Sequence, residues 1–72
     1  MPSFPNRLKE LRKAKGVTHK TMVDYLGVGL RTYQHYEYGD REPNFETLTK
    51  LADYFEVSTD YLLGRSDNPN RQ

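Results

Sequence analysis

Four polar side chains in segment 30–38 are the residues whose types and spacing could carry chemistry. A helix over this segment has a donor-rich outer face formed by Arg31, Thr32, Gln34 and His35. These side chains donate and accept hydrogen bonds, and a helix fits the width of the major groove of B-DNA, where base edges offer complementary groups. The segment is therefore predicted to read DNA bases.

Catalysis is the competing use of such residues. His19 and His35 are the two histidines, and carboxylates are plentiful enough to form an acid–base pair. However, the sequence has no nucleophile elbow, metal-ligand spacing or glycine-rich phosphate loop. A chain of 72 residues also leaves little room for a concave pocket beside its core, and it has no cysteine to bind zinc. We therefore expect no enzyme activity, no metal and no cofactor.

The charges are divided unevenly along the chain. Residues 1–35 contain seven basic and two acidic side chains, whereas residues 36–72 contain four basic and eight acidic ones. Two interpretations fit this asymmetry: the charged helical faces only interact with solvent, or the first half meets a polyanion while the second half faces away from it. The motif described below is needed to decide between them. No apolar run approaches the ~18 residues of a membrane span, and the N-terminus does not resemble a signal peptide. We expect a cytoplasmic protein without a membrane partner.

Helix starts and stops divide the chain into five short helices, and no stretch alternates as a strand would. The first helix is predicted to start near residues 3–5, and the third to run from Leu30 to about Tyr38. N-caps and terminal glycines give the other boundaries. The predicted starts are Thr18, Asn44 and Ser58, and the predicted stops are Gly16, Gly27, Gly39 and Gly64.

The core is predicted from apolar residues at helical spacing. Tyr33, Tyr36 and Tyr61 are expected in the core with solvated hydroxyls, and Tyr25 and Tyr38 on the surface. Further core positions are Leu8, Leu11 and Ala14 in the first helix, Met22, Val23 and Leu26 in the second, and Phe45, Leu48, Leu51, Ala52 and Phe55 in the fourth. Residues 1–64 are expected to form one domain, and residues 65–72 a frayed polar tail or the start of a linker.

The most informative unit is segment 18–38, a capped helix, a glycine turn and a second helix. Only Gly27, Val28 and Gly29 separate the two helices, so the helices must cross steeply. Gly27 is expected because a side chain there would clash where the backbone reverses. This arrangement predicts a helix-turn-helix.

The sequence from about Arg7 to Gly64 resembles the helix-turn-helix domain of phage repressors, Cro proteins and related bacterial regulators of the XRE type. The resemblance implies an all-α, five-helix lambda-repressor-like bundle and a sequence-specific DNA-binding regulator of transcription, in many relatives a repressor. It is carried by Leu8 with Leu11-Arg12, Gly16-Val17-Thr18, Leu26-Gly27-Val28, Tyr36-Glu37 with Gly39 and Pro43, and Val57-Ser58 with Tyr61-Leu62-Leu63-Gly64.

The resemblance also implies roles for individual residues. Arg31 is the candidate for a bidentate guanine contact and Gln34 for an adenine contact. Arg12 and Glu37 match an internal ion pair between the first and third helices. The expected base-contacting residues are Leu30, Arg31, Gln34 and His35. The expected phosphate-contacting residues are Thr18, His19, Lys20, Gly29, Thr32, Tyr38, Arg41 and Asn44.

The expected partner is double-stranded DNA, bound by a homodimer at a palindromic operator with half-sites ~34 Å apart. The predicted dimer surface is the C-terminal apolar material around Phe55, Val57, Tyr61 and Leu62, some of which must belong to the core. A protein-binding module is the alternative, because the same domain type serves as an antitoxin or adaptor and the acidic second half suits a protein partner. A protein binder would more plausibly expose apolar anchors on the third helix, where Leu30 is the one such residue.

Overall fold

The computed structural model describes residues 3–70, and these residues contain helices and no strand. The five α-helices are α1 (Phe4–Lys15), α2 (His19–Leu26), α3 (Leu30–Tyr38), α4 (Phe45–Phe55) and α5 (Thr59–Leu62). This architecture confirms the all-α, five-helix prediction. Within the described part of the chain, no helix is long and apolar enough to cross a membrane.

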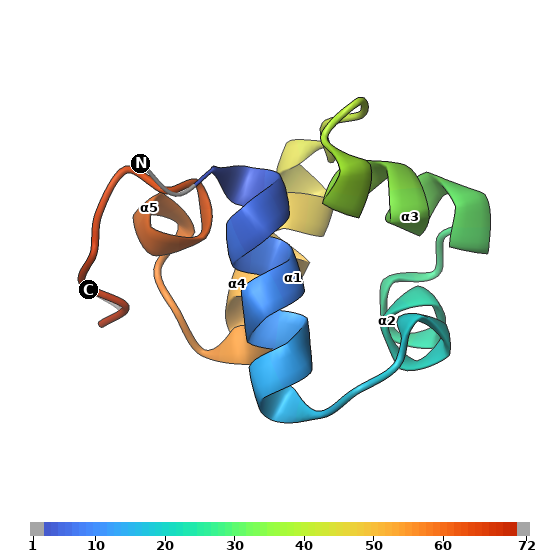
Figure 1. The fold of residues 1–72 in the computed structure, drawn as a ribbon, viewed down its shortest axis with the longest axis horizontal. Coiled ribbons are helices and arrows are strands. Elements are labelled where there is room, and N and C mark those ends of the chain that lie inside the picture. Colours follow the sequence, from blue (N-terminus) through green and yellow to red (C-terminus); the bar gives the residue numbers. More distant parts are fainter. Residues whose placement is uncertain (1–2, 71–72) are drawn as a thin grey trace.

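The helices place α3 and α5 at opposite ends of the molecule, with α1 and α4 between them (Figure 1). α1 contacts both α3 and α5, and α2 packs against α3 and α4. Burial of apolar side chains among these helices is the main source of stability. The buried core consists of Leu8, Met22, Leu26, Tyr33, Tyr36, Leu51, Ala52, Val57 and Leu62.

Side-chain caps start three of the helices where the sequence predicted them. Thr18 accepts a hydrogen bond from the backbone N–H of Thr21, and Asn44 accepts one from Thr47. Ser58 caps α5 in the same way. Each cap satisfies one of the backbone N–H groups that lack an intrahelical partner. Gly29 provides no side-chain cap for α3, so the first N–H groups of that helix lack this partner.

Two predicted core positions lie outside the core. Phe45 is 89 % exposed. It occupies the first position of α4, and at this end of the helix the apolar face extends beyond the elements that cover it. Ala14 is exposed for the same reason near the end of α1, whereas Leu8 on that face is fully buried. Periodicity assigns a face to the whole helix, but the neighbouring elements cover only part of its length.

Two local expectations are also wrong. A Cβ built on Gly27 meets no atom within 4 Å, so a clash does not explain this glycine. The left-handed φ of 71° explains the glycine at this position, because residues with a side chain rarely adopt that conformation. The hydroxyl of Tyr33 is buried rather than solvated.

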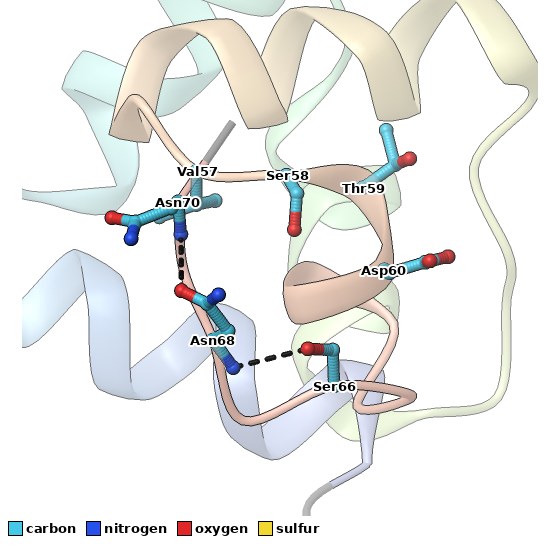
Figure 2. Close-up of a pocket in the computed structure, with 7 residues that line it drawn as sticks. All are labelled: Val57, Ser58, Thr59, Asp60, Ser66, Asn68 and Asn70. Atoms are coloured by element: carbon cyan, nitrogen blue, oxygen red, sulfur yellow. Dashed lines mark hydrogen bonds between the residues drawn. The ribbon is translucent and has the colours of Figure 1, made fainter. Parts of the chain in front are cut away.

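Part of the expected frayed tail packs against the domain. The backbone N–H of Ser58 donates to the carbonyl of Pro69 at 3.1 Å, and Arg65 donates to Asp60 at 2.9 Å. Together with residues 57–60, the returning segment lines an open polar hollow of about 300 Å³ beside α5 (Figure 2). Residues 71–72 lie outside the described part of the chain.

Arg7 anchors this end of the molecule. Its guanidinium donates to the carbonyl of Tyr61 at 3.1 Å and lies 3.7 Å from the centre of the Tyr61 ring. A second nitrogen lies 3.8 Å from the carboxylate of Asp67. Arg7 is only 4 % exposed, so it cannot meet a polyanion as the charge pattern suggested.

The buried positions of Val57 and Leu62 show which part of the expected dimer surface belongs to the core. Both side chains belong to the core, with 5 % and 0 % exposure. Phe55 and Tyr61 from the same expected surface are half-buried. Of the four residues, Phe55 and Tyr61 are therefore the two whose side chains are accessible to a partner.

Candidate nucleic-acid interface

The outer face of α3 carries the side chains expected to read bases. Arg31 is exposed, and Gln34 and His35 are half-buried. Leu30 begins the helix at 50 % exposure, and Tyr38 ends it at 71 %. Among the described residues no carboxylate forms an ion pair with Arg31, in contrast to Lys20, which is held by Asp24. The guanidinium of Arg31 is thus available to a ligand.

α2 and the turn hold this face in position. Figure 1 shows α2 nearly end-on while α3 crosses the view, so the two helices lie steeply inclined as the short turn requires. α2 contacts α3, and Met22 and Leu26 of α2 are buried in the same core cluster as Tyr33 of α3. The inward side of α3 is therefore fixed by packing, which directs its other side to solvent.

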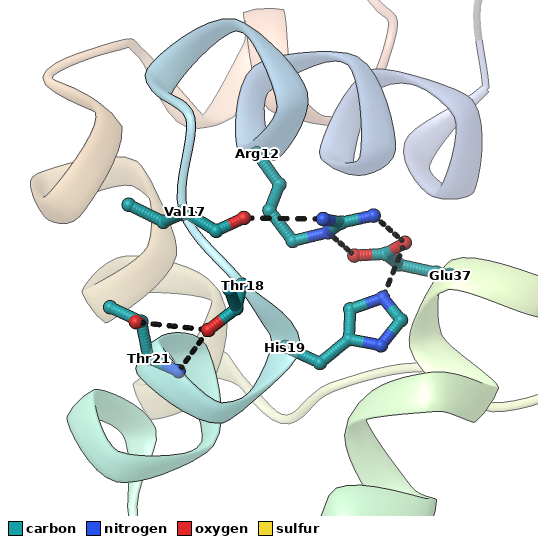
Figure 3. A network of polar contacts seen from close by, with 6 residues as sticks. All are labelled: Arg12, Val17, Thr18, His19, Thr21 and Glu37. Carbon is teal, nitrogen blue, oxygen red and sulfur yellow. Dashed lines mark hydrogen bonds and ion pairs between the residues drawn. The ribbon is translucent and has the colours of Figure 1, made fainter.

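An ion pair ties α1 to α3 (Figure 3). The Nε atom of Arg12 donates to Oε2 of Glu37 at 2.7 Å, and the Nη2 atom of Arg12 donates to Oε1 of Glu37 at 3.3 Å. The remaining guanidinium nitrogen donates to the carbonyl of Val17 at 3.2 Å. This two-point geometry fixes the rotation of α3 about its axis as well as its distance from α1.

His19 is a third member of this cluster. Its Nε2 atom lies 3.5 Å from Oε1 of Glu37 (Figure 3). The centre of its ring lies 5.6 Å from that of the Tyr33 ring. The imidazole therefore directs one nitrogen toward the protein interior. The sequence expectation of a phosphate contact did not include this inward partner.

Burial and neighbouring charges oppose each other at Glu37. Burial raises the pKa of the carboxyl, but the hydrogen bond from Arg12, with smaller contributions from Tyr33 and His19, holds the pKa below its usual value. Burial also raises the pKa of Tyr33, and the neighbouring carboxylate raises it further. The carboxylate of Glu37 is thus the charge around which the cluster is built.

The residues expected to contact phosphate lie mainly near the starts of α2, α3 and α4. Thr18 and Asn44 use their side-chain oxygens as caps, which leaves the amide NH₂ of Asn44 able to donate outward. Lys20 and Arg41 are exposed. The remaining expected residues are His19, described above, Gly29 and Thr32 at the start of α3, and Tyr38 at its end.

Two contacts were missed from the sequence. His35 Nδ1 lies 2.7 and 2.8 Å from the two carboxylate oxygens of Asp40, in the loop after α3. Arg7 is buried beneath Tyr61. The spacing of His35 and Asp40 around Gly39 was the available signal for the first contact, since a left-handed helix end reverses the chain. No local pattern indicated the second, which joins residues 54 positions apart.

The chain is similar to proteins named as transcriptional regulators. It is 47% identical over 60 residues to the SPbeta prophage-derived HTH-type transcriptional regulator YonR of Bacillus subtilis, covering 83% of this chain and 56% of that protein. It is 44% identical over 59 residues to the cryptic phage CTXphi transcriptional repressor RstR of Vibrio cholerae serotype O1, covering 82% of this chain and 53% of the repressor. The chain thus spans about half the length of these curated relatives.

A solved structure of the P22 c2 repressor in complex with synthetic operator 9T has the same fold. Its TM-score is 0.83 at 26% identity, covering 92% of this chain and all of that one. Both curated relatives are named as regulators of transcription, the class of function that the sequence resemblance implied. The helix-turn-helix family model matches residues 8–62. On this match, which includes α2, the turn and α3, the chain belongs to the helix-turn-helix family.

Proposed function

We propose that this protein represses transcription by binding an operator, with α3 in the major groove. The observation that carries the proposal is the exposed hydrogen-bonding face of α3, held in position by the Arg12–Glu37 pair and the buried contacts with α2. Because α3 is already held in place, its side chains can reach base edges without the free-energy cost of ordering the helix on binding. Repression requires only that tight binding blocks access by polymerase.

Base reading is assigned to four residues of α3. Arg31 pairs with guanine, because an unpaired guanidinium matches the two acceptors of that base. Gln34 pairs with adenine, and Leu30 contacts a thymine methyl group. His35 completes the set at the far end of the face.

Phosphate contacts surround this face and set its register. The N–H groups at the starts of α2, α3 and α4 favour anions, and Thr18, Lys20 and Asn44 lie at or beside two of these starts. Gly29 leaves the first N–H groups of α3 open to a phosphate, since it offers them no side chain. The other proposed contacts are His19, Thr32, Tyr38 and Arg41.

A homodimer on a palindromic operator supplies the affinity that one small domain lacks. Two copies of α3 then enter successive major grooves ~34 Å apart. Phe55 and Tyr61 are the half-buried aromatic residues proposed to contribute to the dimer surface. The protein-binding alternative is less well supported, because the exposed apolar side chains of α3, Leu30 and Tyr38, lie at its two ends and polar side chains lie between them.

Selection of binding sites from a random DNA pool tests the proposal. We expect enrichment of one roughly palindromic sequence, bound in a saturable and salt-dependent manner. An Arg31→Ala variant should enrich a sequence that is relaxed at one position of each half-site. Failure to enrich any sequence at low ionic strength would contradict base reading by α3.

A further inference from the structure

His35 is held by a carboxylate from outside its own helix. Its Nδ1 atom lies 2.7 Å from Oδ1 and 2.8 Å from Oδ2 of Asp40. The side chains are 33 % and 60 % exposed, so the pair lies at the surface beside the face assigned to base reading. Both groups are therefore placed where bound DNA would meet them.

The loop that carries Asp40 is fixed by its neighbours. Gly39 ends α3 with a φ of 91°, and its N–H donates to the carbonyl of His35. A Cβ built on Gly39 would lie 3.0 Å from a ring carbon of Pro5 in α1, so α1 confines this turn closely. The ring of His35 also packs edge-on against Tyr38, with centroids 6.0 Å apart. The imidazole thus meets Tyr38 as well as a constrained carboxylate.

This geometry selects one tautomer of the imidazole. An ionised carboxylate only accepts hydrogen bonds, so the proton of a neutral His35 ring must be on Nδ1. The other nitrogen, Nε2, is then an acceptor. Among the described residues Nε2 of His35 has no hydrogen-bond partner, which leaves its lone pair free for an outside donor.

We propose that Asp40 is a positioning residue that determines which bases His35 reads. Because it fixes Nε2 as an acceptor, neutral His35 prefers the amino groups of adenine and cytosine over guanine and thymine, whose major-groove edges offer only acceptors. The inference rests on the proposed function and deepens it. It gives a specificity role to a residue that touches no base.

Asp40→Asn tests the proposal by binding. An asparagine amide can either accept from or donate to Nδ1, so it permits both tautomers. At pH 8 we expect the preference for adenine or cytosine at one base of each half-site to fall about 2- to 10-fold, the range of a single hydrogen bond. Loss of a negative charge should also tighten binding to every sequence by a common factor.

Glu42→Gln is the matched control, because it removes the same charge from the same loop. It should tighten binding to all sequences without changing any base preference. In a His35→Ala background, Asp40→Asn should behave like this control. An unchanged preference in Asp40→Asn, or an equal change in Glu42→Gln, would overturn the proposal.

Nitrogen-detected NMR of the histidine rings tests the tautomer without DNA. In the neutral ring of the free wild-type protein, the His35 proton should lie on Nδ1 alone, and Asp40→Asn should show a population of neutral rings protonated on Nε2. A wild-type ring protonated on Nε2 would refute the assignment. If the wild type binds no DNA, the proposed function fails together with the base preference, whereas the spectrum still decides whether Asp40 sets the tautomer.

Discussion

The proposed base recognition depends most on the guanidinium of Arg31. It is exposed, and within the described residues it has no ion-pair partner. Arg31→Ala should weaken binding to the operator by about 1–3 kcal/mol and remove the preference at one base pair of each half-site. Titration of the operator and of its single-base variants measures both effects.

Arg65→Ala is a charge-matched control for this substitution. Arg65 is exposed and follows α5, at the end of the molecule opposite α3. Its loss should change binding to operator and random DNA by the same small factor. If Arg31→Ala behaves in the same way, Arg31 contacts phosphate rather than a base.

A second prediction concerns Glu37 and the dependence of the free energy of unfolding on acidic pH. Its pKa is lowered in the folded protein, so its contribution to stability is complete above the pKa of the unfolded chain, about 4.3, and is lost as the pH falls through the folded value. Glu37→Gln leaves Arg12 without its carboxylate, and the free energy of unfolding at pH 7 should fall by about 3 kcal/mol. Denaturant unfolding at several pH values measures the loss.

The pH profile distinguishes this mechanism from simple damage to packing. Below pH 5, Glu37→Gln should lose stability less steeply than the wild type, because one proton-binding group has been removed. Glu10→Gln, at an exposed site in α1, should retain the wild-type slope. Parallel profiles for the wild type and Glu37→Gln would show that the carboxylate does not titrate as described.

Residue-level prediction from sequence succeeded where the signal was local. The caps Thr18, Asn44 and Ser58 each serve a backbone N–H three residues away, so a short pattern identifies them. The burial of Arg7 depends on Tyr61 and Asp67, which are distant in sequence. Charge counting therefore assigned Arg7 to a surface that it does not occupy.

At the scale of elements, the two turns that bound α3 differ in how tightly they are confined. Gly27 and Gly39 both have positive φ, but only Gly39 faces a close neighbour, Pro5. Gly27→Ala should cost about 1–2 kcal/mol from backbone strain alone. Gly39→Ala should cost more, because the added methyl group must also displace Pro5. Thermal unfolding of both variants gives the comparison, and an equal loss would show that Pro5 moves aside freely.

Helix types and order were predictable because five apolar patterns are separated by glycines and caps. How far the core extends along each helix was not predictable, since it depends on which elements lie alongside. Phe45 and Ala14 satisfy the periodicity of their helices and are still exposed. The relation between His35 and Asp40 likewise emerges only when the chain turns at Gly39.

At the scale of the whole molecule, α3 and the docked segment after α5 lie at opposite ends (Figure 1). The position of this segment is set by Ser58, Arg7 and Asp60. Substitutions there should therefore change stability or assembly before they change base preference. Because of this separation, the proposed DNA-reading face and the proposed dimer surface can be altered independently.

The spacing of operator half-sites tests the proposed dimer as a unit. Two domains in one rigid dimer can insert α3 on the same side of DNA only when the half-site centres are about one helical turn apart. Inserting about 5 base pairs rotates one half-site to the other side, so affinity should fall to that of an isolated half-site. Equal affinity for the original and expanded operators would show that the domains bind independently, and sedimentation of the complexes would then reveal monomers on each half-site.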